Sequence, residues 1–163
     1  MIFIRLDENI SYKIGEVADL IRIQQGIQFE APHPNAETGL ADQHWMEILG
    51  KRGKRSDLRI AFSGDYFNEA ERATAEVNNI TVFYAPRNYW RGLLRVGQAA
   101  YVLRWLPKMI ELATSLPAGT QFQLPASFNP AVKVKLLDRI LGKKVTRSGR
   151  PRKPRNLPLL DGN

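Results

Sequence analysis

The sequence predicts an α/β protein in which a mainly parallel sheet is covered by helices on both faces. Short apolar runs alternate with longer segments whose apolar residues recur at helical spacing, and this alternation predicts strand–helix–strand units. The length of 163 residues and an apolar fraction of 44% suit one domain with one hydrophobic core. We therefore expect a three-layer α/β/α arrangement.

The first part of the chain contains two expected strands separated by a helix. Residues 2–6 are an apolar run that stops at acidic residues, which predicts a buried strand. Ser11 can cap the helix that follows, and Gly26 suits the residue just after its C-terminus. Residues 27–31 predict a second strand, which ends in a proline-containing loop over residues 32–41.

The later elements alternate in the same way. A short helix opens at Asp42 and closes in a glycine-containing turn at residues 50–53. Beyond it we expect a strand at 58–62, a helix at 69–77, a strand at 80–85 and a long helix at 93–116. Pro107 can kink the long helix. We divide the chain into a main domain over residues 1–116, a C-terminal extension over 117–142 and a tail over 143–163.

The net charge of +8 belongs almost entirely to the tail. Of the 24 basic residues, seven lie within residues 143–155, with no acid among them. They are Lys143, Lys144, Arg147, Arg150, Arg152, Lys153 and Arg155. Without them, 17 basic residues face 16 acidic ones, so the body carries about +1. We expect the tail to be extended when alone and to contact either RNA phosphates or an acidic protein partner.

Composition excludes several classes of function. The chain has no cysteine, which excludes disulfides, thiolate metal sites and cysteine nucleophiles. No apolar stretch approaches the ~20 residues that span a bilayer, and no secretory signal is recognisable. We therefore expect a soluble, cytoplasmic protein that does not bind membranes.

Three aspartates stand at positions that predict a shared site. Asp7 follows the first expected strand, Asp65 follows the strand at 58–62, and Asp42 begins the helix that leads into that strand. In a parallel sheet with right-handed crossovers, helix starts and strand ends lie at the same edge. All three carboxylates should therefore face one crevice, with Glu8 and Asn9 beside them.

Such a cluster is typical of a divalent metal site. Two carboxylates about 4 Å apart repel by roughly 4 kcal/mol at an effective dielectric of 20. Mg²⁺ or Mn²⁺ removes this penalty and prefers oxygen ligands. A bound ion can activate water and neutralise charge on an attacked phosphate, as in phosphodiester hydrolysis or in a phosphatase. Each acid also has a structural interpretation: a helix cap for Asp42, a turn residue for Asp65 and a strand-end residue for Asp7.

The order of these motifs resembles that of compact PIN-like domains, which include the VapC-type ribonuclease toxins of bacterial toxin–antitoxin pairs. Residues 7–9 resemble the DEN motif, residues 42–49 the D-x-x-[IWL]-x-x-[IL] helix, and residues 63–65 the [TS]-x-D turn. The resemblance covers residues 1–90. It implies that Asp7, Asp42 and Asp65 hold the metal, that Ser63 supports the site, and that the substrate is RNA.

The resemblance also implies a protein antitoxin as partner. One departure concerns a further glutamate that longer PIN domains carry, because this chain has no clear counterpart; Glu8 and Glu37 are the substitutes it offers. The cations that we expect to hold an RNA backbone at the acidic edge are Arg87 and Arg91, followed by Arg95 at the same spacing. An exposed helix face is the structural alternative for them.

Three hypotheses follow. The first is a metal-dependent endoribonuclease, the toxin of a toxin–antitoxin pair. The second is a non-enzymatic RNA-binding or protein-interaction module whose acids are structural. The third, a receiver-like phospho-acceptor, ranks last because Pro86-Arg87 stands where a lysine is needed after the last strand. The aromatic residues Tyr89, Trp90, Tyr101 and Trp105 have helical spacing, which indicates a core or a homodimer interface.

Overall fold

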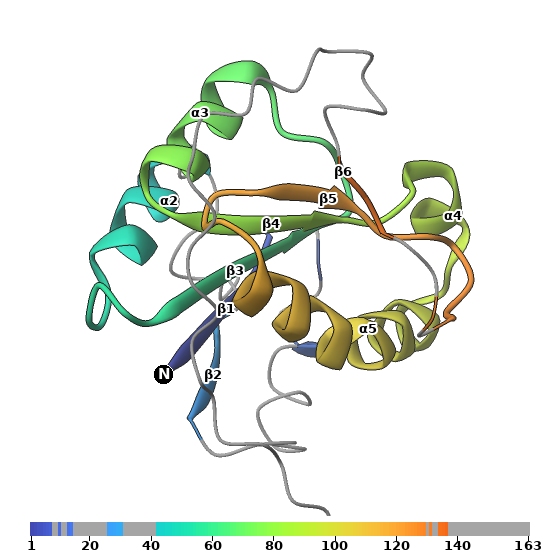
Figure 1. Cartoon of the computed structure of the whole chain (residues 1–163). Coiled ribbons are helices and arrows are strands. Elements are labelled where there is room, and N and C mark those ends of the chain that lie inside the picture. The colour runs from blue at the N-terminus through green and yellow to red at the C-terminus, as the bar shows by residue number, and fades with distance from the viewer. Residues whose placement is uncertain are drawn as a thin grey trace, which may run out of the picture.

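The computed structural model describes residues 1–7, 10, 13–14, 26–30, 42–129, 131 and 134–136. Within these residues the chain forms one sheet, with strand order β2-β1-β3-β4-β5-β6 (Figure 1). The strands are β1 (Ile2–Leu6), β2 (Ile27–Glu30), β3 (Leu58–Ser63), β4 (Ile80–Tyr84), β5 (Gln121–Gln123) and β6 (Lys135–Leu136). The first five run parallel to one another and β6 is antiparallel to β5. The predicted mainly parallel sheet is confirmed.

Helices cover both faces of this sheet (Figure 1). They are α2 (Asp42–Lys51), α3 (Glu69–Val77), α4 (Arg87–Gly92) and α5 (Arg95–Ser115). Helices α2 and α3 lie on one face and α5 lies on the other, while α4 stands beyond the carboxyl end of β4. The α/β/α layering expected from the sequence is therefore present.

The alternation of side chains along β1 and β3 explains the two cores. Ile4 and Ile60 point toward α5 and pack with its buried Trp105. Their neighbours Phe3 and Ala61 point to the other face and pack with residues of α2 and α3. Both faces of the central strands are thus buried, as expected for parallel strands between helical layers.

A buried arginine fixes the end of α2 against the start of β3. Arg59 is 6% exposed, and its guanidinium donates hydrogen bonds to backbone carbonyls, including that of Leu49 at 3.0 Å and that of Asp57 at 3.2 Å. These carbonyls lie at and after the C-terminus of α2, where a helix leaves acceptors without intrahelical partners. Arg59 therefore caps α2 and sets the direction in which β3 begins.

Three elements were not expected from the sequence: α4, β5 and β6. Helix α4 forms between Pro86 and Leu93, before the long helix, and α5 then continues through Pro107 to Ser115. Strand β5 comes from the segment assigned above to a C-terminal extension, and it pairs in parallel with β4.

Most of the first predicted helix, the loop over residues 32–41 and the tail over 143–163 lie outside the described residues. Across the part of the chain that is described, no helix has the length and apolar character needed to cross a membrane.

Candidate functional site

A row of polar side chains runs across the carboxyl ends of four neighbouring strands. Leu6 of β1 pairs with Phe62 of β3, so Asp7 comes level with Ser63. Ser63 pairs with Tyr84 of β4, and Tyr84 pairs with Gln123 of β5. Three strand spacings separate the two ends of the row, a distance of roughly 14 Å. Ligands of open α/β sheets bind at this edge.

Ser63 connects the first and third predicted acids. Its Oγ lies 2.6 Å from Oδ2 of Asp7, and the backbone N–H of Asp65 donates a hydrogen bond to Oγ of Ser63 at 3.2 Å. The carbonyl oxygen of Asp65 is 2.8 Å from Oγ, but the carboxylate of Asp7 is the stronger acceptor for the single hydroxyl proton. Asp7 is buried, at 5% exposure, so this hydrogen bond offsets part of its desolvation.

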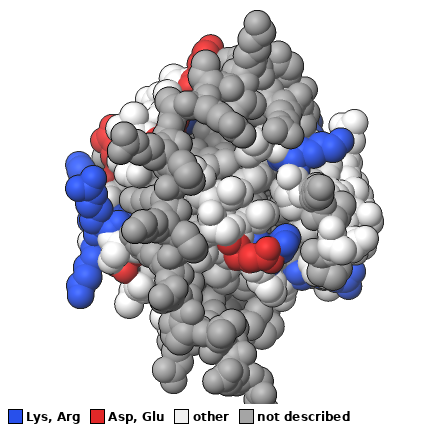
Figure 2. Space-filling view, viewed as in Figure 1, with Lys and Arg blue, Asp and Glu red and all other residues white. Residues whose placement is uncertain are grey.

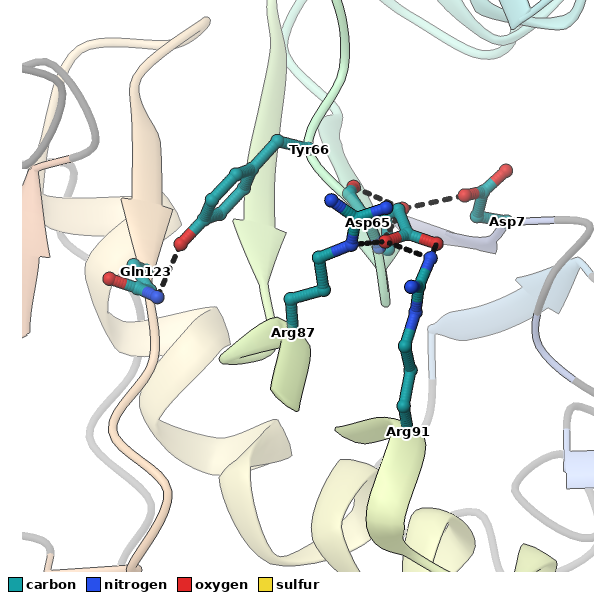
Figure 3. Close-up of polar contacts among 7 residues, drawn as sticks. Asp7, Asp65, Tyr66, Arg87, Arg91 and Gln123 are labelled. Atoms are coloured by element: carbon teal, nitrogen blue, oxygen red, sulfur yellow. Dashed lines mark hydrogen bonds and ion pairs between the residues drawn. The ribbon is translucent and has the colours of Figure 1, made fainter. Parts of the chain in front are cut away.

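The carboxylate of Asp65 is held by two arginines of α4. Nε of Arg87 is 2.8 Å from Oδ1, and Nη2 of Arg91 is 3.2 Å from both carboxylate oxygens (Figure 3). The side chains of Arg87 and Arg91 are 56% and 57% exposed, and that of Asp65 is 39% exposed. Ion pairs this exposed contribute about 0–1 kcal/mol each. The arginines can therefore leave Asp65 at little cost.

Asp42 lies in the first turn of α2, whose direction brings this end of the helix to the carboxyl edge. Nε1 of Trp45 donates a hydrogen bond to Oδ1 of Asp42 at 2.9 Å. The guanidinium carbon of Arg5 lies 5.5 Å from the centroid of the Trp45 ring, a cation–π arrangement. Asp42 is thus hydrogen-bonded to a residue of its own helix.

Packing at Gly64 places α4 beside this group. A Cβ atom at Gly64 would lie 2.2 Å from Nε1 of Trp90, so the indole rests directly on the glycine backbone. Trp90 is 3% exposed and meets Phe62 edge-to-face, with ring centroids 5.3 Å apart. Because Trp90 lies between Arg87 and Arg91 on the six-residue helix, this contact sets where both guanidinium groups can reach.

An aromatic and an amide complete the other end of the row. Nε2 of Gln123 donates a hydrogen bond to the hydroxyl of Tyr66 (Figure 3). The Tyr66 ring meets that of Tyr84 edge-to-face, with ring centroids 5.3 Å apart. Tyr66 remains 36% exposed. Partial burial raises the pKa of Tyr66, so its hydroxyl stays protonated at neutral pH. Burial raises the pKa of Tyr84 further.

The side chains at this edge have the oxygen atoms that a hard divalent cation prefers, but those that are described do not surround one point. The carboxylates of Asp7 and Asp65 and the hydroxyl of Ser63 are oxygen donors, as Mg²⁺ and Mn²⁺ prefer. Among the described residues, however, no three acidic or histidine side chains converge as they would around one ion. Two arginines already contact the carboxylate of Asp65, so a metal ion would compete with them for its oxygens.

The structure thus joins the carboxylate of Asp7 to the backbone of Asp65 through Ser63, and it joins Asp42 to Trp45 of its own helix. Glu8, Asn9 and Glu37 lie outside the described residues, as do the predicted RNA-binding residues of the tail. Sequence reasoning did not find the ion pairs of Asp65, although the spacing of Arg87 and Arg91 after a strand indicated cations at this edge. It also did not find Tyr66 and Gln123, whose roles depend on strand β5.

No family model matches the chain, and neither the curated proteins nor the solved structures include one significantly similar to it. The interpretation of the site therefore depends on the geometry described above.

Proposed function

We propose that this protein is a metal-dependent endoribonuclease that hydrolyses phosphodiester bonds of RNA at the carboxyl edge of its sheet. The observation that supports this proposal most is the Asp7–Ser63–Asp65 group beside the exposed Arg87 and Arg91. Acidic oxygens next to exposed guanidinium groups combine what a phosphodiester cleavage site needs. The carboxylates attract a cation and the guanidiniums attract the phosphate.

The residues of the chain would divide these tasks. Arg87 and Arg91 project from one face of α4, and a planar guanidinium can bind two phosphate oxygens at once. When a phosphate draws them away, the carboxylate of Asp65 becomes available. Ser63 keeps Asp7 oriented through its 2.6 Å hydrogen bond, and Asp42 supplies further negative charge at the same edge.

Mg²⁺ or Mn²⁺ would be held by Asp7 and Asp65, with Asp42 as the third carboxylate that the family resemblance implies. When bound, the ion would lower the pKa of a water molecule and neutralise charge on the attacked phosphate. Its charge of +2 competes directly with Arg87 and Arg91 for Asp65. Since those ion pairs are largely exposed, competition favours a divalent ion that several oxygens can ligate.

Cleavage of total cellular RNA tests this proposal. We expect cleavage with Mg²⁺ or Mn²⁺, none with EDTA, and at least a 100-fold loss for Asp7→Asn, Asp42→Asn or Asp65→Asn, because each change removes a charge that attracts the ion. The matched control is Glu47→Gln, an exposed acid farther along α2. Wild-type cleavage that persists in EDTA, or an Asp65→Asn variant of undiminished activity, would refute the proposal.

One observation favours a second function. With Asp65 neutralised by two arginines and no three-acid cluster among the described residues, the same edge suits a non-enzymatic RNA-binding or protein-interaction module. Such a module would bind RNA equally well with Mg²⁺ and with EDTA and would leave the RNA intact. The cleavage assay separates the two functions directly.

We further propose that the chain acts as the toxin of a toxin–antitoxin pair. The support is the acidic group itself, since Asp65 accepts guanidinium groups from its own chain and could accept them from another. An antitoxin would present an arginine or lysine to this edge, or cover it. A complex with the carboxyl edge fully open would contradict this expectation.

A further inference from the structure

The row across the strand ends has a part that metal chemistry does not use. Asp7 lies at one end of the row, and Asp65 forms ion pairs with two arginines. Tyr66 and Gln123 lie at the far end (Figure 3). Tyr66 follows Asp65 directly in the chain, so their Cα atoms are about 3.8 Å apart. The backbone of Tyr66 is therefore next to that of the residue whose carboxylate Arg87 and Arg91 hold, and in Figure 3 its ring extends toward Gln123.

The geometry points to Tyr66 and Gln123 as a nucleobase subsite: the ring stacks on a base of a single-stranded RNA while Arg87 and Arg91 bind the adjoining phosphate. This inference rests on the proposed function in that it takes RNA as the ligand of this edge. It adds which part of the RNA is contacted and where on the molecule this happens.

The Tyr66 ring is fixed in place before any ligand arrives. Tyr84 contacts it edge-to-face, and the amide of Gln123 holds its hydroxyl, so two of its sides are supported by β4 and β5. The residue nevertheless keeps 36% of its surface exposed. A rigid, exposed tyrosine binds with little loss of side-chain entropy, and stacking tolerates any base because every base has a π-face.

Gln123 adds groups that can contact the edge of a base. Its Nε2 donates one hydrogen to Tyr66, which leaves a second amide hydrogen and the Oε1 acceptor. Within the described part of the chain, no residue hydrogen-bonds to that oxygen, and the Tyr66–Gln123 pair is exposed. A base stacked on Tyr66 would meet one donor and one acceptor at its edge.

The length of the row agrees with a single strand of RNA lying along it. Roughly 14 Å, or three strand spacings, separates Asp7 from Gln123, with the arginines of α4 between the two ends. A base and its adjoining phosphates can occupy such a length together. The stacked base would then lie on one side of the arginines. The acids would lie on the other side and face the phosphodiester.

Binding without hydrolysis tests the inference. Anisotropy of a fluorescein-labelled RNA of about eight nucleotides is measured in EDTA, beside a ribose–phosphate oligomer of equal length without bases. We expect Tyr66→Ala to weaken RNA binding about 5- to 150-fold, the range for loss of one stacked base, and to leave binding of the abasic oligomer unchanged. Tyr66→Phe keeps the ring and should stay within about 3-fold of wild type. Gln123→Ala should change which bases are preferred.

Tyr89→Ala is the matched control, since Tyr89 is an equally exposed tyrosine (40%) that contacts Tyr101 and stands off the row. Equal weakening by Tyr66→Ala and Tyr89→Ala, or equal losses for RNA and the abasic oligomer, would overturn the subsite. If the wild type cleaves RNA but Tyr66→Ala binds it normally, the subsite fails while the proposed function stands. If the wild type binds RNA through Tyr66 but never cleaves it, the subsite stands and the nuclease proposal fails.

Discussion

The carboxylate of Asp65 forms ion pairs with two arginines. Both proposed ligands of the site, a metal ion and a phosphate, would compete with these ion pairs. Arg87 and Arg91 keep it neutralised when neither metal nor phosphate is bound. Under the proposed function, a phosphate that takes the arginines would free Asp65 for a cation, and a cation that takes Asp65 would free the arginines for a phosphate. The two ligands should therefore strengthen each other's binding, because such coupling is reciprocal.

Removing the arginines should separate these effects. In the double variant Arg87→Gln, Arg91→Gln we expect Mn²⁺ to bind about 3- to 10-fold more tightly, since two exposed ion pairs no longer compete with it. RNA measured in EDTA should bind more weakly, because two phosphate contacts are lost. Isothermal titration with Mn²⁺ and anisotropy with RNA measure the two changes. Arg104→Gln, at an exposed position of α5, is the control. Unchanged Mn²⁺ affinity in the double variant would contradict the competition.

At the scale of elements, the packing of α4 on the end of β3 sets the geometry of the site. The indole of Trp90 occupies the space that a side chain at residue 64 would need. Gly64→Ala should lower the free energy of unfolding by about 1–3 kcal/mol, because a buried indole has to move. Chemical denaturation measures this change. RNA binding should weaken as well, since Arg87 and Arg91 move with α4.

Gly92→Ala provides the matched control on the same helix. A Cβ atom there meets nothing within 4 Å, so stability should stay the same or rise by up to ~1 kcal/mol. If Gly64→Ala proved as stable as wild type with normal RNA binding, the contact with Trp90 would not be what positions α4.

The elements also show how far a sequence predicts this fold. Strands β1, β3 and β4 were predictable because each is a short apolar run between helical segments. Helix α4 has six residues, fewer than two helical turns, and so leaves no clear period. Strand β5 has three residues with one buried side chain, Phe122, and its place is fixed by pairing with β4 rather than by its own pattern.

The same limit applies to the site. That Asp7 and Asp65 follow neighbouring strands, and that Asp42 begins the helix before β3, followed from the order of strands and helices. Their contacts did not follow, because these depend on side-chain directions: Asp42 turns toward Trp45, and Asp65 turns toward α4.

At the scale of the whole molecule, charge divides between body and tail. The seven cations of residues 143–155 account for almost all of the net charge of +8. On the face shown in Figure 2, the described Lys and Arg side chains form separate groups rather than one continuous basic surface. Long-range attraction for RNA should therefore come mainly from the tail.

Deletion after Gly142 tests this division. Each phosphate neutralised on a single strand contributes a slope of about −0.7 in log K against log salt. If most of the seven cations engage RNA, the deletion should flatten the slope by roughly 3 to 5 units. Cleavage at saturating RNA should change little, because the acids remain. An unchanged slope would assign the tail to a protein partner instead.

The most direct test of the central claim is a Mn²⁺ titration followed by electron paramagnetic resonance. The account predicts that the wild type binds an ion that Asp7→Asn and Asp65→Asn each lose, while Glu47→Gln retains it. In the Asp42→Asn variant, added RNA should tighten the remaining Mn²⁺ binding, because its phosphate draws Arg87 and Arg91 away from Asp65. Equal Mn²⁺ binding by the wild type and by both the Asp7→Asn and Asp65→Asn variants would contradict a metal centre at this edge.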